Sequence, residues 1–181
     1  MKIVLDACVL FPTVLREILI GAARAGLFTP LWSDRILEEW ARATRKLGDG
    51  AEVIARGEVA LLRAAFPGAC VPVRPAIEAR LTLPDDNDRH VLAVAVAAGA
   101  DAIVTFNAAD FPRHVLAEEG LSRRDPDGFL WELWSHHPET VLKVVESVRA
   151  EAERLSGRPQ PLRALLKRAQ LPRLGKALDQ V

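Results

Sequence analysis

Residues 83–105 read LPDDNDRHVLAVAVAAGADAIVT and indicate a helix that leads directly into a buried strand. The apolar side chains of the first part recur at helical spacing, at Val91, Leu92, Ala95 and Val96. Gly99 suits the end of that helix, and residues 102–105 form the apolar run of a buried parallel strand. Alternation of this kind predicts an α/β protein with a parallel sheet.

The same alternation begins at the N-terminus. Short apolar runs predict strands at residues 3–5 and 70–73. Helical spacing of apolar residues predicts helices at residues 13–25, 34–47 and 51–65. Ser33 is placed to cap the second of these helices.

From about Gly128 on, the pattern changes to helices alone. These helices are predicted at residues 129–134, 138–155, 162–169 and 174–178. We therefore expect an α/β domain with a central parallel sheet at residues 1–128. A C-terminal helical extension at residues 129–181 should pack on or beside it.

The composition is that of an ordinary globular protein. Half of the 181 residues are hydrophobic, and the 24 basic side chains balance 24 acidic ones, so the net charge neither favours nor excludes a nucleic-acid partner. Cys8 and Cys70 lie far apart in apolar surroundings, which predicts buried free thiols in a reducing compartment. No stretch is apolar for long enough to span a bilayer. A cytoplasmic protein without membrane contact is expected.

Two aspartates follow the predicted strands. Asp6 comes directly after residues 3–5, and Asp110 follows residues 102–105 after a short loop. Open α/β sheets place their ligands at the carboxyl ends of parallel strands, so both carboxylates should lie at that edge. A charge at the end of a buried strand is costly unless it is paired or bound to a metal.

Helical geometry selects a third acid, Glu39, over its neighbour Glu38. With Ile36 as the reference and about 100° per residue, Glu39 lies about 60° from the apolar stripe and Glu38 about 160° away. Glu39 is therefore predicted to face inward. Its alternative role is an ordinary surface ion pair with Arg35 or Arg42.

A fourth acid, Asp88, lies on the inward face of the first turn of its predicted helix. Capping explains an acid or an amide at that boundary, and Asn87 or Asp86 is the predicted cap. Capping does not explain a carboxylate on the buried face, which favours a functional role for Asp88.

The four acids together predict a metal site, because several carboxylates in one place repel each other unless a divalent cation neutralises them. Ligands that are all oxygen favour Mg²⁺ or Mn²⁺ over zinc. The histidines fit no zinc pattern, and each is predicted to be a surface or capping residue: His90, His114, His136 and His137. Nucleotide-binding glycine motifs and a nucleophile elbow are absent from the sequence, which leaves phosphodiester hydrolysis as the favoured chemistry.

The chain resembles the PIN-domain nucleases, and among them the VapC-like toxins of bacterial toxin–antitoxin pairs. The resemblance covers residues 1–114 and rests on four motifs in order: IVLDACVL with Asp6, SDRILEEW with Glu39, LPDDNDRHVLAVA with Asp88 and VTFNAADF with Asp110.

This resemblance implies a three-layer α/β/α sandwich and an acidic quartet that holds Mg²⁺ or Mn²⁺ and cleaves RNA. The quartet positions match Asp6, Glu39, Asp88 and Asp110, and the polar positions beside them resemble Asp85, Thr105 and Asn107. The implied chemistry is in-line attack of water on a backbone phosphate, with Asp6, Asp88 and Asp110 placing metal and water. Glu39 would orient the water or hold a second ion. The implied partners are an RNA substrate and a small antitoxin protein.

Two other functions stay open from the residues alone. A phosphatase of the haloacid dehalogenase type would want an acid two residues after Asp6, where Cys8 stands. A non-catalytic binding module of PIN-like fold would tolerate the loss of an acid, and all four are present. One or two metal ions, and a monomer or a homodimer, are open alternatives.

Overall fold

The computed structural model describes residues 1–179, which fall into two compact units. Unit 1 comprises Met1–Phe11 and Thr29–Arg124, and unit 2 comprises Pro12–Phe28 and the described residues from Asp125 on. The helix predicted at residues 13–25 belongs to unit 2, together with the helices that follow residue 125. The division of the chain at residue 128 stays a prediction.

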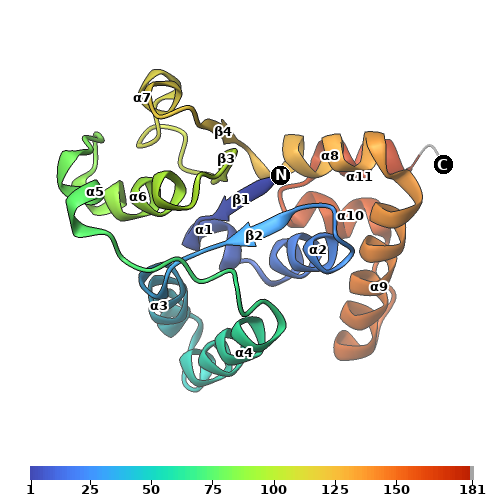
Figure 1. The fold of residues 1–181 in the computed structure, drawn as a ribbon. Coiled ribbons are helices and arrows are strands. Elements are labelled where there is room, and N and C mark those ends of the chain that lie inside the picture. The colour runs from blue at the N-terminus through green and yellow to red at the C-terminus, as the bar shows by residue number, and fades with distance from the viewer. Residues whose placement is uncertain (180–181) are drawn as a thin grey trace. The chain divides into compact units, whose positions relative to one another are not determined.

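Unit 1 is built on a four-stranded parallel sheet (Figure 1). Its strands, in the order β2-β1-β3-β4, are β1 (Lys2–Leu5), β2 (Thr29–Leu31), β3 (Ala102–Val104) and β4 (Ser122–Arg124). The central strands β1 and β3 pair Ile3 with Ala102 and Leu5 with Val104, and all four side chains are buried. The predicted α/β class with a central parallel sheet is confirmed.

The prediction of a strand at residues 70–73 is wrong. Cys70 forms a single β-bridge, with Trp32, and Pro72 has no N–H to continue a ladder. The neighbour of β1 on that side is instead β2, a three-residue edge strand that contains Pro30. Proline is tolerated at a sheet edge, but in so short a run it hides the strand from a search for apolar runs.

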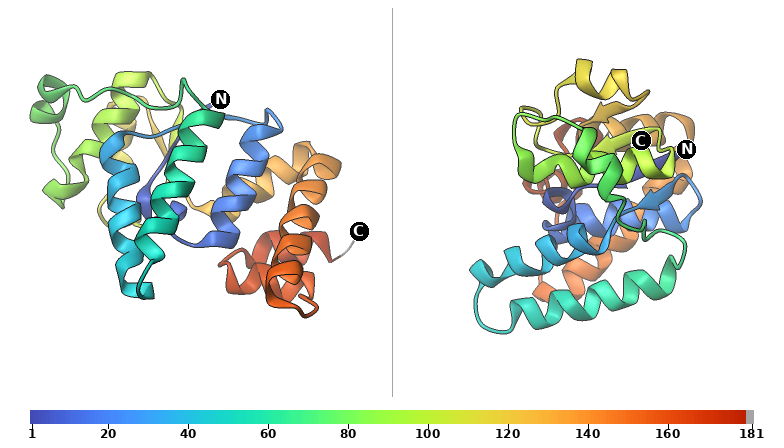
Figure 2. Two further views of the ribbon diagram at one scale, coloured as in Figure 1. Left: turned by 90° about the horizontal axis from the view of Figure 1, so that it is seen from below. Right: turned by 60° about the vertical axis from the view of Figure 1, so that its left-hand side comes forward.

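The helices of unit 1 cover the sheet and extend from it. They are α1 (Ala7–Leu10), α3 (Asp34–Ala43), α4 (Ala51–Ala65), α5 (Pro75–Arg80), α6 (Arg89–Ala98) and α7 (Arg113–Glu118), with 3₁₀ turns η1 (Thr44–Leu47) and η2 (Asp86–Asp88). Helix α6 packs against β1 and β3, and α7 packs against β4. Helices α3 and α4 lie side by side (Figure 2). The predictions for α4 and α6 are confirmed, and that for α3 is confirmed up to Ala43, where the 3₁₀ turn η1 begins. The short helices α1, α5 and α7 were not predicted.

A buried cap fixes the start of α3. Oγ of Ser33 accepts a hydrogen bond from the backbone N–H of Ile36 at 3.2 Å, as the sequence predicts. The buried face of the helix includes Leu37 and Ala41 as well as Ile36 and Trp40. This face is wider than the predicted stripe, which changes how the two glutamates of α3 are placed.

Within the described residues, unit 2 contains helices and no strand, as predicted for the C-terminal part of the chain. The helices are α2 (Thr13–Arg24), α8 (Pro126–His136), α9 (Pro138–Ser156), α10 (Leu162–Arg168) and α11 (Pro172–Leu178). The Asp127 carboxylate of α8 accepts hydrogen bonds from the backbone N–H groups of Arg173 and Leu174, which fixes the start of α11 against α8. Phe28 and Phe129 meet edge to face at 5.2 Å between ring centroids.

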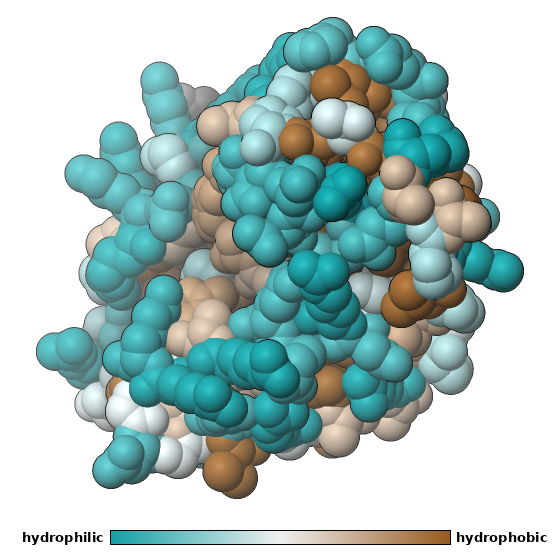
Figure 3. Space-filling view, turned by 90° about the vertical axis from the view of Figure 1, so that its left-hand side faces the viewer, coloured by the Kyte–Doolittle hydropathy of each residue, from teal (hydrophilic) through white to brown (hydrophobic). Residues whose placement is uncertain are grey.

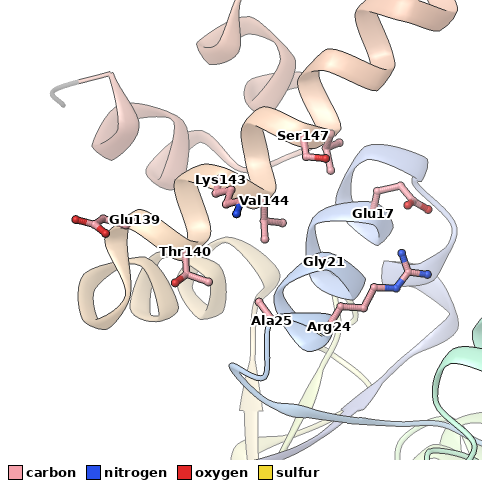
Figure 4. Close-up of a pocket in the computed structure, with 10 residues that line it drawn as sticks. Glu17, Gly21, Arg24, Ala25, Glu139, Thr140, Lys143, Val144 and Ser147 are labelled. Atoms are coloured by element: carbon pink, nitrogen blue, oxygen red, sulfur yellow. The ribbon is translucent and has the colours of Figure 1, made fainter.

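Helices α2 and α9 approach closely at Gly21. A Cβ atom on Gly21 would lie 2.6 Å from Cγ1 of Val144 (Figure 4). A hollow of about 590 Å³ opens beside this contact, and Glu17, Arg24 and Lys143 are among the residues that line it. The hollow contains none of the predicted site residues, so it takes no part in the chemistry predicted from the acids.

Gly21→Ala should destabilise the protein by about 1–3 kcal/mol, because the added methyl overpacks the helix contact. Alanine is the better helix former by about 1 kcal/mol, so any loss must come from the clash. The further change Val144→Ala should restore the lost stability. Urea unfolding of the three proteins measures these differences.

Gly57 of α4 is the matched control, because an added Cβ there meets nothing within 4 Å. Gly57→Ala should therefore stabilise the protein by up to about 1 kcal/mol. A Gly21→Ala protein as stable as this control would contradict the predicted overpacking against Val144.

Candidate functional site

The pairing of β1 with β3 places Asp6 beside Thr105. The backbone N–H of Asp6 donates to the carbonyl of Val104 at 3.2 Å, just beyond the end of β1. The hydroxyl of Thr105 donates to Oδ2 of Asp6 at 2.7 Å, and the thiol of Cys8 donates to the same oxygen at 3.1 Å. Asp6 is only 7% exposed, so these donors replace the water that its carboxylate has lost.

The thiol of Cys8 acts here as a hydrogen-bond donor. Burial, followed by the nearby charge of Asp6, raises the pKa of Cys8 to about 12, so the thiol stays protonated at neutral pH and is a poor nucleophile. Cys8 and Cys70 are both free, as predicted. The prediction that both are buried is wrong, because each thiol turns to an aspartate, Asp6 or Asp34, and remains partly exposed.

Asn107 joins the end of β3 to two further acids. Its side-chain amide nitrogen donates to Oδ2 of Asp88 at 3.0 Å and to Oδ2 of Asp110 at 2.6 Å. An amide nitrogen carries two hydrogens, so these bonds use both of them. The backbone N–H of Asn107 donates to Oγ1 of Thr105 at 2.9 Å. A continuous chain of hydrogen bonds therefore runs from Asp6 through Thr105 and Asn107 to Asp88 and Asp110.

Asp85 completes a group of three aspartates. Carboxylate oxygens of Asp85, Asp88 and Asp110 lie within 4.8 Å of one another, and we call these three residues the aspartate cluster. Asp85 also accepts hydrogen bonds from the backbone N–H and the side-chain amide of Asn87, at 2.8 and 3.0 Å. Asp6 and Glu39 lie outside the cluster as defined by these distances.

The predicted helix caps in this segment are wrong. Neither Asn87 nor Asp86 caps α6, because the 3₁₀ turn η2 precedes the helix and Asp85 caps that turn. Asp88 itself occupies the N-cap position of α6 without making a side-chain cap bond. Its carboxylate is therefore available to the aspartate cluster.

The pKa of Asp88 reflects its burial and the charges of the cluster and of Asp6. Burial raises this pKa first, and the charges of Asp6, Asp110 and Asp85 raise it further, to about 6. A divalent cation fits these residues, because they offer oxygen donors and their charges repel one another without it. Oxygen donors of this kind suit Mg²⁺ and Mn²⁺.

Glu39 is placed at a distance from this network. Its Oε1 lies 3.0 Å from Nε2 of His90 and 3.1 Å from Nε of Arg35. Burial raises the pKa of Glu39, but the contacts with His90 and Arg35 outweigh burial and hold the pKa below its usual value. The carboxylate is therefore charged at neutral pH.

Glu38 and Glu39 have similar exposed fractions but differ in their partners, and burial acts more strongly on Glu39. Their side chains are 35% and 40% exposed, because the buried face of α3 is wider than predicted. Glu38 accepts hydrogen bonds from Arg56 of α4 and from Arg42, and these bonds lower its pKa to about 2. The choice of Glu39 as the functional residue of the pair stays a prediction.

Sequence reasoning underestimated two further residues. His90, predicted to be a surface or capping residue, is 5% exposed because it lies on the inward side of the first turn of α6. Arg123 of β4 donates to the carbonyls of Ala108 and Phe111, which braces the loop that carries Asp110. The run RHVL at the start of α6 gives a weak sequence signal for the burial of His90. No sequence signal marks the contacts of Arg123.

Charged pairs surround α3 and α5. Arg35 lies 3.5 Å from Glu78 of α5, and Arg80 of the same helix forms a bidentate pair with Glu119. The side of the molecule that carries these helices is largely hydrophilic (Figure 3).

A parallel sheet that gathers carboxylates at the carboxyl ends of its strands defines a class of α/β proteins with an acidic edge suited to a divalent cation. The model of the PIN domain family matches residues 2–109, and the chain belongs to this family. Comparisons with curated proteins and with solved structures returned no match. PIN domains are typically metal-dependent nucleases that act on RNA. Over residues 1–179, no helix is both long and apolar enough to cross a membrane.

Asp88→Asn should change the stability of the metal-free protein in a pH-dependent way. The pKa of Asp88 is raised from 3.8 to about 6 on folding, so the folded protein holds this proton more tightly than the unfolded chain. The resulting stabilisation is complete below about pH 4 and is lost as the pH rises through 6. The variant should therefore melt above the wild type at pH 8 and with it at pH 4.

The gain should be at most about 1 kcal/mol, because Asp88 is partly exposed and its charge is screened. Thermal unfolding in the presence of a chelator measures it. Asp86→Asn, which removes an exposed acid of the same turn, is the control and should show no gain. Added Mn²⁺ should stabilise the wild type more than Asp88→Asn. Identical melting of all three proteins at both pH values would argue against repulsion in the cluster.

Proposed function

We propose that this protein is a metal-dependent endoribonuclease that hydrolyses phosphodiester bonds in RNA. The observation that carries the proposal is the aspartate cluster at the carboxyl edge of the sheet of a PIN domain. Such a cluster would repel a phosphate unless a cation lay between them. The site would therefore need the cation in order to bind its substrate. Asp85, Asp88 and Asp110 would hold the ion, with Asp6 beside them.

The surrounding residues prepare the cluster for this task. A bound Mg²⁺ or Mn²⁺ supplies positive charge for the phosphate and lowers the pKa of water. Asn107 holds Asp88 and Asp110 at a fixed separation through one neutral amide. Thr105 and Cys8 hold Asp6 through a single oxygen, Oδ2, which leaves Oδ1 for other partners. Preorganised groups of this kind need no rearrangement when the reaction begins.

Glu39 would act at the periphery of the site. Its lowered pKa keeps it a carboxylate, so it can accept a hydrogen bond from water and orient it, or hold a second ion. This role and the acidic quartet of Asp6, Glu39, Asp88 and Asp110 are supported by the resemblance to PIN-domain nucleases. The contacts of Glu39 with Arg35 and His90 support a fixed carboxylate at this place.

The two alternatives have less support. A phosphatase would want an acid where Cys8 stands, and the pKa of Cys8, about 12, keeps it from replacing one. A binding module would gain nothing from carboxylates that repel one another, because such repulsion destabilises the fold.

We further propose that the nuclease is the toxin of a toxin–antitoxin pair and acts in the cytoplasm. This finer assignment is supported by the resemblance of the four motifs to VapC-like toxins. The free thiols of Cys8 and Cys70 suit a reducing compartment. An antitoxin would most simply place a basic side chain against the aspartate cluster, where it competes with the cation for the same charges.

Purified protein should cleave RNA when Mg²⁺ or Mn²⁺ is present and stop when a chelator removes the ion. Asp88→Asn and Asp110→Asn should lower the cleavage rate by at least about 100-fold, because each removes a carboxylate from the ion site. Glu39→Gln should also abolish most activity, whereas Glu38→Gln should keep most of it. A gel assay on a mixed RNA pool measures all four variants.

Asp86→Asn again serves as the control, because this exposed acid belongs to the same 3₁₀ turn but not to the aspartate cluster. Wild-type protein that binds Mn²⁺ but leaves RNA intact would favour the binding module. Greater sensitivity at Glu38 than at Glu39 would show that the pair has been assigned the wrong way round.

Expression of the chain alone should arrest the growth of its host cell. The arrest should disappear with Asp6→Ala, provided that immunoblots show equal amounts of both proteins. Co-expression of an antitoxin encoded next to the gene should also relieve it. Normal growth in the presence of accumulated soluble wild-type protein would contradict the toxin assignment while leaving the nuclease assay to decide the activity.

A further inference from the structure

His90 is a buried polar residue in the first turn of α6, two positions after Asp88. Its Nε2 lies 3.0 Å from Oε1 of Glu39 on α3. Neither ring nitrogen makes an aligned hydrogen bond within the part of the chain that the structure describes. The ring therefore meets Glu39 at hydrogen-bonding distance with imperfect direction. Contacts of this kind often become aligned only when substrate binds.

Packing alone does not explain a histidine at this position. A buried polar group without full hydrogen bonds destabilises the fold, and an apolar side chain of similar size would avoid that cost. The same turn carries Asp88 in the aspartate cluster and His90 against Glu39. One turn of α6 therefore connects two acids that come from different helices.

Arg35 contacts the same oxygen of Glu39 from a more exposed position. Its Nε donates to Oε1 at 3.1 Å, while its terminal nitrogens lie 3.2 Å from the carbonyl of Asn87 and 3.5 Å from Glu78. The side chain of Arg35 is 46% exposed, so water and salt screen its charge. The imidazole of His90 is buried, so water and salt screen its contact with Glu39 much less.

We infer that His90 is a positioning residue that fixes the carboxylate of Glu39 relative to Asp88. Its consequence for cleavage rests on the proposed nuclease function, whereas the contact itself does not. Without the imidazole, Glu39 would be held by exposed Arg35 alone, and its long side chain would occupy several rotamers. Loss of such a supporting contact typically lowers activity by about 10- to 100-fold.

Two substitutions separate positioning from packing. His90→Gln brings an amide nitrogen near the place of Nε2 and keeps a donor for Glu39, whereas His90→Leu fills the space without a donor. The ring borders a cavity of about 100 Å³, so either side chain can be accommodated. His114→Leu, at an exposed histidine of α7, is the control.

We expect His90→Leu to lower kcat for RNA by about 10- to 100-fold with a much smaller change in KM, and His90→Gln to retain most of the rate. A second readout uses metal-free protein. The ¹³C signal of the Glu39 carboxyl group, assigned by its disappearance in Glu39→Gln, should move in His90→Leu and stay near its wild-type position in His90→Gln and His114→Leu.

Two results would overturn the inference. One is a Glu39 signal that is the same in His90→Leu as in the wild type. The other is an equal loss of kcat in His90→Leu and His90→Gln with an equal fall in Tm, which would show a purely structural role. Failure of the wild type to cleave RNA would instead contradict the proposed function, and the carboxyl signal would still decide whether His90 positions Glu39.

Discussion

The parallel pairing of β1 with β3 is the constraint on which the site depends. Its register sets Leu5 opposite Val104, so the next residues, Asp6 and Thr105, leave the sheet together. The hydrogen bond between them then starts the chain that reaches Asn107 and the aspartate cluster. A shift of one residue in this pairing would turn each side chain of the strand to the other face and separate the acid from its donor.

Repulsion between the carboxylates of the cluster opposes folding, and hydrogen bonds from neutral donors reduce this cost in stability. Asp88 illustrates the conflict, because its pKa of about 6 reflects burial and three neighbouring carboxylates. The partners that hold these acids are a hydroxyl, a thiol and an amide, from Thr105, Cys8 and Asn107, and none of them neutralises a charge. The structure therefore keeps its negative charge for a cation, at some cost to its own stability.

Much of this arrangement could be predicted from the sequence, because buried strands and long helices have strong periodic signals. The central strands, α3, α4 and α6 are of this kind, and Asp6 and Asp110 follow from where the strands end. The errors lie where short-range rules are weak. A proline hides β2, a 3₁₀ turn moves the cap from Asn87 or Asp86 to Asp85, and a wide buried face removes the contrast between Glu38 and Glu39. The burial of His90 depends on which elements pack against α6, and the sequence of α6 alone does not show this.

Asn107 holds Asp88 and Asp110 through one neutral amide. This contact makes the separation of the two carboxylates independent of the strength of their repulsion. Dissolved salt partly screens the repulsion between partly exposed carboxylates that lie within a few ångströms of each other. It has little effect on a short amide hydrogen bond. Ionic strength should thus alter the energy stored between Asp88 and Asp110 while leaving their separation unchanged. Asp88 and Asp110 keep their separation in dilute and concentrated salt alike, and only the strength with which they attract positive charge varies.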